Sequence, residues 1–518
     1  MANFFKRAKV DMKYLSKPND KLTPKGLKRK KRAKRTVAGL VLVLIQFILM
    51  ILFLFQVFYL NLLPMKYIIM LNVVLILLTL YTFTSQFTRS HIIGKILSVL
   101  LSIVLLTGFL GVSKFGSILG IISGTTTKTD IVDIVVLAND PAASIKDTLS
   151  YAYGYNSTVN SSITTKALSD IEADNNTSLD TKTYSTWDAL IPALYDNQDI
   201  QAIAINDSVM STLAEQYEDF DTRTKIVGTI KITTEIKLSS SDKKVNEEPF
   251  VVYISGNDGY GEISSTGRSD VNILACVNPQ TRQVLLVSTP RDSYITISNS
   301  EGKSGLDKLT HAGNAGIEYS ISALEVLYGT SVDYYFKINF SGCVGIVDAL
   351  GGITINSTVD FTNGWEAAPE SYHFTVGDNK CDGEKTLAFV RERKAFANGD
   401  FQRGKNQEAA IQAIIDKGTS PSILTNYGAV LDAASNMILT NMSTGTITSL
   451  IRGQLSNSTA WNVQSYSLTG STGSRNGQVY GLSGMSVVLP DDSSIATAKD
   501  LMNKITAGEV FDVSEYEQ

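Results

Sequence analysis

Four arginines in two short segments are the residues best suited to chemistry in this 518-residue chain. Arg291 lies in STPRDSY, and Arg391, Arg393 and Arg403 lie in AFVRERKAFANGDFQRGKNQ. A guanidinium keeps its charge at any usable pH and presents a planar fork of donors, so several that converge suit a phosphate or pyrophosphate. Scattered surface arginines are the alternative interpretation. Neighbouring turn residues and apolar, strand-like runs favour an anion cradle.

The stretch SGNDGYGEISSTGRSDVNILACV contains two candidate metal ligands. Asp258 lies in a glycine-rich loop, and Asp270 follows Arg268 at the mouth of a predicted strand. Magnesium takes oxygen ligands and keeps waters and substrate phosphates, so two carboxylates beside a phosphate site would suffice to hold it. The alternative is structural, with Asp258 as a turn residue and Asp270 paired with Arg268.

Further candidates lie at and after Arg291. This arginine ends an apolar strand, where Pro290 stops the pairing, and strand ends in α/β sheets are common ligand positions. Downstream, DKLTHAGNAG supplies Lys308, a point-charge donor for phosphate, and His311. The histidine is either a proton shuttle or a structural residue.

The second arginine segment predicts a shared anion-binding face. If the stretch is extended, Arg391 and Arg393 point to the same side, with the glutamate between them opposite. Arg403 and Gln407 lie four apart on a predicted helix, in its first two turns, where the helix dipole favours an anion. Asp400, just before that helix, is expected to be its N-cap.

The N-terminal part predicts a membrane anchor. Residues 1–36 carry fourteen Lys or Arg against two aspartates, so the net charge of −4 conceals an acidic remainder. This asymmetry argues against nucleic-acid binding and favours a basic arm on an anionic membrane surface. Apolar runs over 37–60, 64–83 and 92–122 are each long enough to cross a bilayer. A cleavable signal peptide does not fit, because the basic region is too long and further spans follow at once.

Charge also predicts the orientation of these spans. The basic tail favours the cytoplasm, and Arg89, His91 and Lys95 place the second loop on the same side. Three crossings then leave everything after about Ser123 outside the cell. The sequence thus predicts a multi-pass membrane protein with a large extracellular region.

The exported part predicts two α/β domains. An accessory domain is expected over 123–240 and a main domain over 248–518, joined by the polar linker KLSSSDKKVNEE. The Ser-, Thr- and Asn-rich stretch 151–186 is expected to be loop. Mixed strands and helices predict a mixed sheet flanked by helices. The predicted strands are 133–138, 201–205, 225–232, 250–254, 271–277, 283–288 and 332–338, and the predicted helices are 187–195, 209–218, 319–327, 343–350 and 401–416.

Cysteine and histidine are scarce. Three cysteines in the exported part argue against a disulfide framework, although pairing of Cys343 with Cys381 stays open. Only three histidines occur, which excludes a histidine-rich metal site.

Several motifs carry a family resemblance. STPRDSYI, DKLTHAG, DYYFKINFSGCVGIVDALGGITI and AFVRERK...GDFQRGKNQ occur in this order and resemble the LytR-CpsA-Psr (LCP) family of Gram-positive envelope proteins. The resemblance covers about residues 248–420. Three spans followed by an accessory domain are similar to CpsA-type, capsule-locus members. The resemblance implies a phosphotransferase that moves a capsular or exopolysaccharide chain from a polyprenyl-pyrophosphate carrier to peptidoglycan through a phosphodiester link.

The resemblance also implies roles for individual residues. Magnesium would lie at Asp258 and Asp270, the polyprenyl tail would lie between the sheet and its helices, and Arg291, Arg391, Arg393 and Asp270 would act in catalysis. The general base stays open between Asp270 and Asp292. The residues expected to hold the pyrophosphate are Arg268, Arg291, Lys308, Arg391, Arg393, Arg403 and Gln407.

Two other functions remain open at this stage. The exterior could sense lipid-linked sugar and signal through the basic tail to polysaccharide-synthesis proteins. Alternatively, the same cradle could cleave the carrier's pyrophosphate with water in place of the sugar acceptor.

Overall fold

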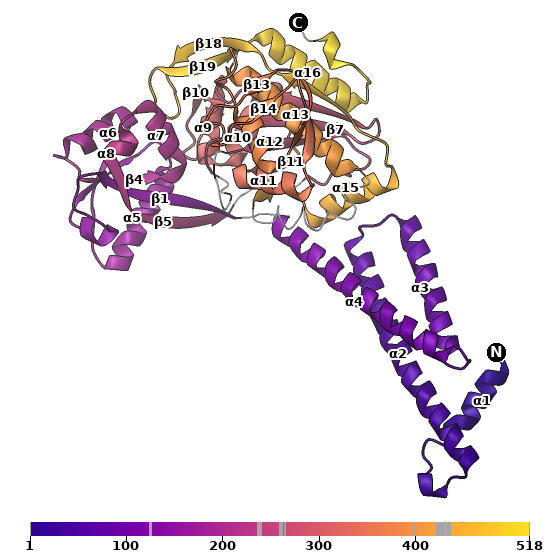
Figure 1. Ribbon diagram of the computed structural model, residues 1–518. Helices are drawn as coiled ribbons and strands as arrows, with labels where there is room; N and C mark the ends of the chain where they lie inside the picture. The colour runs from indigo at the N-terminus through magenta and orange to yellow at the C-terminus, as the bar shows by residue number, and fades with distance from the viewer. Residues whose placement is uncertain are drawn as a thin grey trace. The chain divides into compact units, whose positions relative to one another are not determined.

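The computed structural model describes residues 2–123, 127–235, 241–257, 259, 263, 266–397, 399–420, 430 and 437–516. The chain forms two compact units, which are described separately (Figure 1). The first comprises residues 1–119 with 445–457, and the second comprises residues 120–444 with 458–518.

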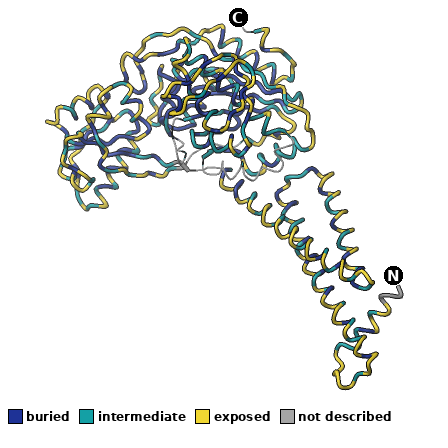
Figure 2. The backbone as a smooth tube through the Cα atoms, viewed as in Figure 1, coloured by how far each residue is buried: buried dark blue, intermediate teal, exposed yellow. Residues whose placement is uncertain are grey.

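Three long apolar helices dominate the first unit and confirm the three predicted spans. Each is long and apolar enough to cross a membrane. They pack on one another around Met50, Leu75 and Leu105, and most of their other apolar side chains are exposed (Figure 2). Such exposure suits helices surrounded by lipid. The helices of this unit are α1 (Ala2–Met12), α2 (Pro24–Leu60), α3 (Met65–Ser85), α4 (His91–Ile122) and α15 (Thr444–Ser456).

The segment that follows the three long helices is a five-stranded α/β module. Its sheet has the order β3-β2-β4-β1-β5, with β2 parallel to β3 and β4, and β1 antiparallel to β4 and β5. The predicted strands and helices of this segment are present. Its strands are β1 (Thr127–Leu137), β2 (Ala152–Asn156), β3 (Asp180–Tyr184), β4 (Ala202–Asn206) and β5 (Thr224–Glu235), and its helices are α5 (Ser161–Asn175), α6 (Trp187–Asp196), α7 (Met210–Gln216) and α8 (Phe220–Arg223).

The expectation that 151–186 is loop is wrong. This stretch contains β2, α5 and β3. Ala167, Leu168 and Ile171 follow a helical spacing on α5 and are buried against the sheet. Burial of this narrow apolar stripe outweighs the low helix propensity of the surrounding Ser, Thr and Asn residues.

The main domain is built on a mixed sheet, as predicted, and this sheet has six strands. Its order is β16-β11-β6-β7-β8-β17, and the β11–β6 and β17–β8 pairs are parallel while the others are antiparallel. The strands are β6 (Phe250–Gly256), β7 (Val271–Asn278), β8 (Gln283–Ser288), β11 (Tyr334–Ile338), β16 (Ile438–Thr440) and β17 (Asn462–Ser467). Smaller pairs are β9 (Tyr294–Ser298) with β10 (Ser304–Lys308), β12 (Ile353–Ser357) with β15 (Gly377–Cys381), β13 (Phe361–Thr362) with β14 (His373–Phe374), and β18 (Gly470–Arg475) with β19 (Met485–Pro490).

Helices cover both faces of this sheet. On one face, residues of α10 and α16 join Tyr253, Leu274 and Tyr335 in a continuous core. On the other face, α11, α12 and α13 enclose a cavity, described below. The helices of this domain are α9 (Leu309–Ala315), α10 (Ile317–Tyr328), α11 (Phe340–Ala349), α12 (Gly383–Arg391), α13 (Gly399–Thr419) and α16 (Asp492–Ala507).

The α/β module and the main domain share one core. Leu213 of the module and Leu309 of the main domain belong to the same buried cluster. Ser208 Oγ donates to the Asn314 carbonyl at 3.0 Å, and Asn314 Nδ2 donates to Thr212 Oγ1 at 3.3 Å. The start of α7 is therefore anchored on α9.

Candidate functional site

A cavity of about 840 Å³ lies between the sheet and helices α11, α12 and α13. Phe336 and Ile338 are two apart on β11, so they point to the same face, while Lys337 between them is fully buried on the other. The body of the cavity is apolar. Its apolar lining includes Ile254, Val271, Phe336, Ile338, Phe340, Ile346, Leu387, Val390, Ala410, Ile411, Ile414, Ile415 and Ile438.

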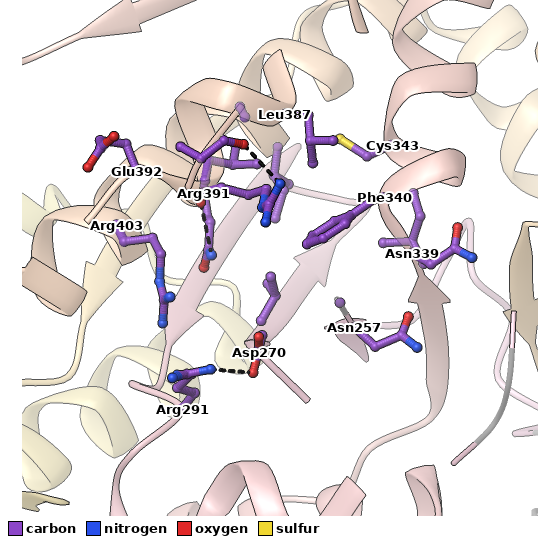
Figure 3. A pocket seen from close by; sticks show the side chains of 18 of the residues that line it. Asn257, Asp270, Arg291, Asn339, Phe340, Cys343, Leu387, Arg391, Glu392 and Arg403 are labelled. Atoms are coloured by element: carbon purple, nitrogen blue, oxygen red, sulfur yellow. Dashed lines mark hydrogen bonds and ion pairs between the residues drawn. The ribbon is translucent and has the colours of Figure 1, made fainter. Parts of the chain in front are cut away.

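Charged residues predicted from the sequence line the same cavity. They come from the segment before β7, the end of β8, the end of α12 and the first turns of α13, and Figure 3 shows several of them together. The structure thus brings residues far apart in sequence to one place. The members of this set are Arg268, Asp270, Arg291, Arg391, Arg393, Arg403 and Gln407, and we call them the arginine mouth.

Asp270 is the central anion of the arginine mouth. Arg291 Nη1 donates to Asp270 Oδ1 at 2.9 Å, as Figure 3 shows, and Thr310 Oγ1 donates to the same oxygen at 3.3 Å. Arg268 Nε lies 4.0 Å away. Burial alone would raise the pKa of Asp270, but Arg291, Arg268 and Arg403 lower it to about 2.

This low pKa bears on the choice of a general base. A carboxyl group with a pKa of about 2 holds a proton poorly at neutral pH, so Asp270 is suited to charge binding rather than to proton abstraction. Asp292 is likewise suited to charge binding rather than to proton abstraction. Burial would raise its pKa, but Arg291 and Lys308 lower it below its ordinary value.

Arg391 does not lie in an extended stretch, contrary to the prediction. It is the last residue of α12, and the chain becomes extended only at Glu392, because the helix ends there. Its guanidinium lies 4.3 Å from the centre of the Phe340 ring, and Nη1 donates to the Ala367 carbonyl at 2.9 Å. The aromatic face and the carbonyl thus hold the cation in place, and no carboxylate of the described residues pairs with it.

Arg393 is the least engaged arginine of the mouth. Its backbone N–H donates to Glu392 Oε1 at 2.9 Å, whereas its side chain has no hydrogen bond or ion pair within the described residues. Glu392 is buried and also accepts from the Gly364 and Ala395 N–H groups. The backbone around Arg393 is thus fixed while its guanidinium is available.

Arg403 and Gln407 lie one turn apart on α13, as predicted. Arg403 Nη2 contacts Asp400 Oδ1 at 2.9 Å, and Gln407 Nε2 donates to the Val390 carbonyl at 3.4 Å. Asp400 is not the N-cap, because α13 already begins at Gly399, so this carboxylate lies within the first turn. Burial lowers the pKa of Arg403, and Asp400 opposes that effect.

Two predicted site residues are not part of the described arginine mouth. Lys308 is buried and contacts Asp292 Oδ1 at 3.2 Å, and Asp292 Oδ2 lies 3.7 Å from Arg291 Nε. The lysine therefore lies behind Arg291 and supports it through Asp292. Asp258 lies outside the described residues.

The single carboxylate of the arginine mouth, Asp270, could serve as one magnesium ligand. In the described part of the chain, no group of three or more His, Cys, Asp or Glu residues forms a metal site. Magnesium needs only one or two protein carboxylates when substrate phosphates supply the other ligands. Asp270 meets that need, since its hydrogen bonds to described residues all use Oδ1 and leave Oδ2 available.

His311 has a structural position. Its ring Nδ1 lies 2.7 Å from Asp307 Oδ1, and both side chains are fully buried. Asp307 Oδ2 also accepts from the Val479 and Tyr480 N–H groups at 3.1 and 3.0 Å. The pair thus joins β10 and α9 to the segment before β19.

We expect Asp307→Ala to destabilise the fold by about 3 to 5 kcal/mol, because it leaves several buried donors without an acceptor. Burial would raise the pKa of Asp307, but the hydrogen bond from His311 and two backbone N–H groups lower it below its ordinary value. The unfolded pKa is about 3.9, so this stabilisation is complete above about pH 5 and is lost as the pH falls through the lower folded value. Thermal unfolding of the full chain in detergent between pH 3 and 7 measures both effects.

The matched control is Asp174→Asn, on the exposed side of α5. It should shift neither the unfolding temperature nor its pH profile. Equal stability of the Asp307→Ala and wild-type chains would contradict the prediction.

Several site features were not predicted from the sequence. Glu215 of α7 and Phe340 of α11 line the cavity, and so does Trp365, which is 82% exposed. Nothing in the local sequence of Glu215 signals its contact with distant arginines. All three cysteines are free, so the possible pairing of Cys343 with Cys381 does not occur in this structure.

Comparison with known proteins identifies the family. The family model described as the LytR_cpsA_psr family matches residues 208–503, more than half of the chain. This chain belongs to the LytR-CpsA-Psr family. The LCP region therefore includes α7, α8 and β5, the last elements of the α/β module, as well as the whole six-stranded sheet.

Curated relatives include proteins named polyisoprenyl-teichoic acid–peptidoglycan teichoic acid transferase TagU. The protein from Bacillus cereus is 34% identical over 243 residues, which cover 47% of this chain and 73% of that one. The protein from Bacillus mycoides is 36% identical over 197 residues, which cover 38% of this chain and 61% of that one.

Solved structures with similar sequences include gbs0355 from Streptococcus agalactiae and TagU from B. subtilis. The first is 27% identical, and the match covers 51% of this LCP protein and 90% of the gbs0355 chain, with a TM-score of 0.44. The second is also 27% identical, and the match covers 51% of this LCP protein and 100% of the TagU chain, with a TM-score of 0.39.

Proposed function

We propose that this LCP protein is a phosphotransferase that moves a glycopolymer from a polyprenyl-pyrophosphate carrier to peptidoglycan. One observation carries the proposal: a cluster of arginines and a large apolar cavity form a single pocket. A pyrophosphate joined to a long hydrocarbon chain has the same two-part chemistry. The name of the TagU relatives, a transfer of teichoic acid to peptidoglycan, supports the same reaction class.

The apolar cavity suits the polyprenyl tail. Its volume of about 840 Å³ lies in the usual range for small-molecule pockets. Burial of hydrocarbon contributes about 0.8 kcal/mol for each CH₂ group. The tail therefore supplies binding energy at a distance from the reacting phosphates, and the arginine mouth fixes their position.

The reaction is a phosphoryl transfer between two oxygens. The acceptor hydroxyl attacks the phosphorus joined to the glycan, a new O–P bond forms, and the P–O bond to the second phosphate breaks. Polyprenyl monophosphate leaves, and the hydroxyl proton passes to a base or to solvent. Arginines fixed around the phosphates neutralise the charge that gathers on their oxygens, which is the main requirement of such a step.

Magnesium is part of the proposal. Asp270 would hold it together with Asp258, and the donor phosphates and water would complete its ligands. When bound, the ion adds positive charge next to the phosphate oxygens. The three apolar helices anchor the protein in the membrane, and we place the exterior domains outside the cell.

The glycan is proposed only as a class. Teichoic acid is named for the curated relatives, whereas the three-span organisation resembles that of capsule-locus members. A capsular or exopolysaccharide chain is therefore our proposed substrate, and the basic tail is available to bind polysaccharide-synthesis proteins.

A reconstituted assay tests the reaction class. The full chain in lipid nanodiscs is mixed with a polyprenyl-pyrophosphate-linked glycan, magnesium and peptidoglycan fragments. We expect a covalent adduct of glycan and peptidoglycan through a phosphodiester, detected by mass spectrometry. Free phosphorylated glycan without the adduct would instead establish a hydrolase and contradict the transferase.

A further inference from the structure

Glu215 introduces a carboxylate from the α/β module into the arginine mouth. Its Oε2 lies 2.9 Å from Arg268 Nη1, and its Oε1 lies 3.6 Å from Arg291 Nη2. The side chains of Arg268 and Arg291 are only 6% and 7% exposed, whereas that of Glu215 is 44% exposed. An accessible anion thus contacts two buried cations that we assign to pyrophosphate binding.

Three other carboxylates contact arginines of the mouth, and their side chains are less exposed than that of Glu215. Asp270, Asp292 and Asp400 have side chains 19%, 14% and 22% exposed, and each contacts an arginine or lysine of its own domain. Glu215 has the longer side chain and the greater exposure, and one of its two contacts exceeds hydrogen-bond distance. Solvent screens an ion pair more strongly when one of its side chains is accessible to water. Glu215 is therefore the most easily displaced of the carboxylates that contact Arg268, Arg291 or Arg403.

The backbone that carries Glu215 is fixed. The start of α7 is anchored on α9 by Ser208 and Thr212, and Leu213 is buried in the shared core. Release of the carboxylate therefore requires only rotation of one side chain. Arg268 Nη1 keeps a contact with the Ser211 carbonyl at 3.5 Å, so this arginine stays oriented when Glu215 moves.

We propose that Glu215 is an exchangeable counter-ion that the pyrophosphate of the donor displaces from Arg268 and Arg291. This inference rests on the proposed function. A pyrophosphate carries more negative charge and more acceptor oxygens than one carboxylate, so it competes successfully for both guanidiniums. A single phosphate competes less well. Glu215 therefore favours the pyrophosphate donor over the monophosphate product and helps the product to leave.

The test is the affinity for inorganic pyrophosphate, measured by calorimetry on the full chain in detergent. Glu215→Gln keeps the shape of the side chain and removes the competing charge. We expect pyrophosphate to bind about five- to tenfold more tightly to this variant than to wild type. This increase in affinity should be smaller at high salt, because salt screens the charge of Glu215 in wild type. We also expect both KM and kcat for the lipid-linked donor to fall, because the donor binds more tightly and the product leaves less easily. In Glu215→Asp the shorter side chain cannot reach both arginines, so this variant should show part of the increase in pyrophosphate affinity.

Glu218→Gln is the matched control, since Glu218 is exposed on the same module and makes no ion pair with any described residue. It should leave the affinity unchanged. An unchanged or weaker affinity in Glu215→Gln, or an equal gain in Glu218→Gln, would overturn the inference. If the wild-type chain bound no pyrophosphate, the proposed function itself would fail, so the two failures are distinguishable.

Discussion

Arg393→Ala should lower kcat/KM for glycan transfer by about 100-fold, and the Arg391→Ala, Arg393→Ala double variant should lower it below detection. Removal of one positioned charge from a phosphoryl-transfer site typically costs a factor of 10² to 10³ or more. The guanidinium of Arg393 makes no hydrogen bond or ion pair with the described residues, so its loss breaks no such contact of the folded protein. The reconstituted transfer assay measures the effect.

The type of cation should matter as well as its charge. Arg393→Lys keeps the charge and loses the planar fork, so we expect a loss of about tenfold rather than 100-fold. Lys405→Ala removes an exposed positive charge from α13 and should leave the rate unchanged. Equal activity of Arg393→Ala and wild type would remove Arg393 from the site, and an equal loss in Lys405→Ala would indicate a general charge effect.

The sequence predicted elements whose signals are local. The three spans, the β7–β8 pair and helices α10 and α13 follow from apolar runs and their spacing. Residue type and spacing indicated the charged residues around Arg291 and Arg403, and the family motifs then assigned them roles. The β2, α5 and β3 elements were missed because their composition is polar and only a narrow stripe is apolar.

The remaining features depend on long-range contacts. Arg391 reaches the mouth because α12 ends there and its guanidinium packs on Phe340, which begins α11. Ile338 and Phe336 have the same local pattern as core residues, so the sequence does not show that they line a cavity. Glu215 could not be assigned, since an exposed glutamate on a short helix has no distinctive local signal.

The second large effect concerns the cavity. Ile411→Trp should reduce transfer from a long-chain donor by at least tenfold, because the larger ring fills space that we assign to the polyprenyl tail. Ile411 lines the cavity and is only half-buried, so the indole can extend into the cavity with little repacking of the core. Each CH₂ group excluded from the cavity forfeits about 0.8 kcal/mol of binding. Binding of the lipid-linked donor is measured together with the rate.

Inorganic pyrophosphate separates this effect from misfolding. It needs only the arginine mouth, so its affinity for Ile411→Trp should equal that for wild type, whereas the affinity for the long-chain donor falls. Gln412→Trp adds the same ring at the next position of α13, which is exposed, and should change neither affinity. Equal weakening of pyrophosphate and lipid-linked donor in Ile411→Trp would mean that the variant distorts the mouth. An unchanged donor affinity would place the polyprenyl tail outside this cavity.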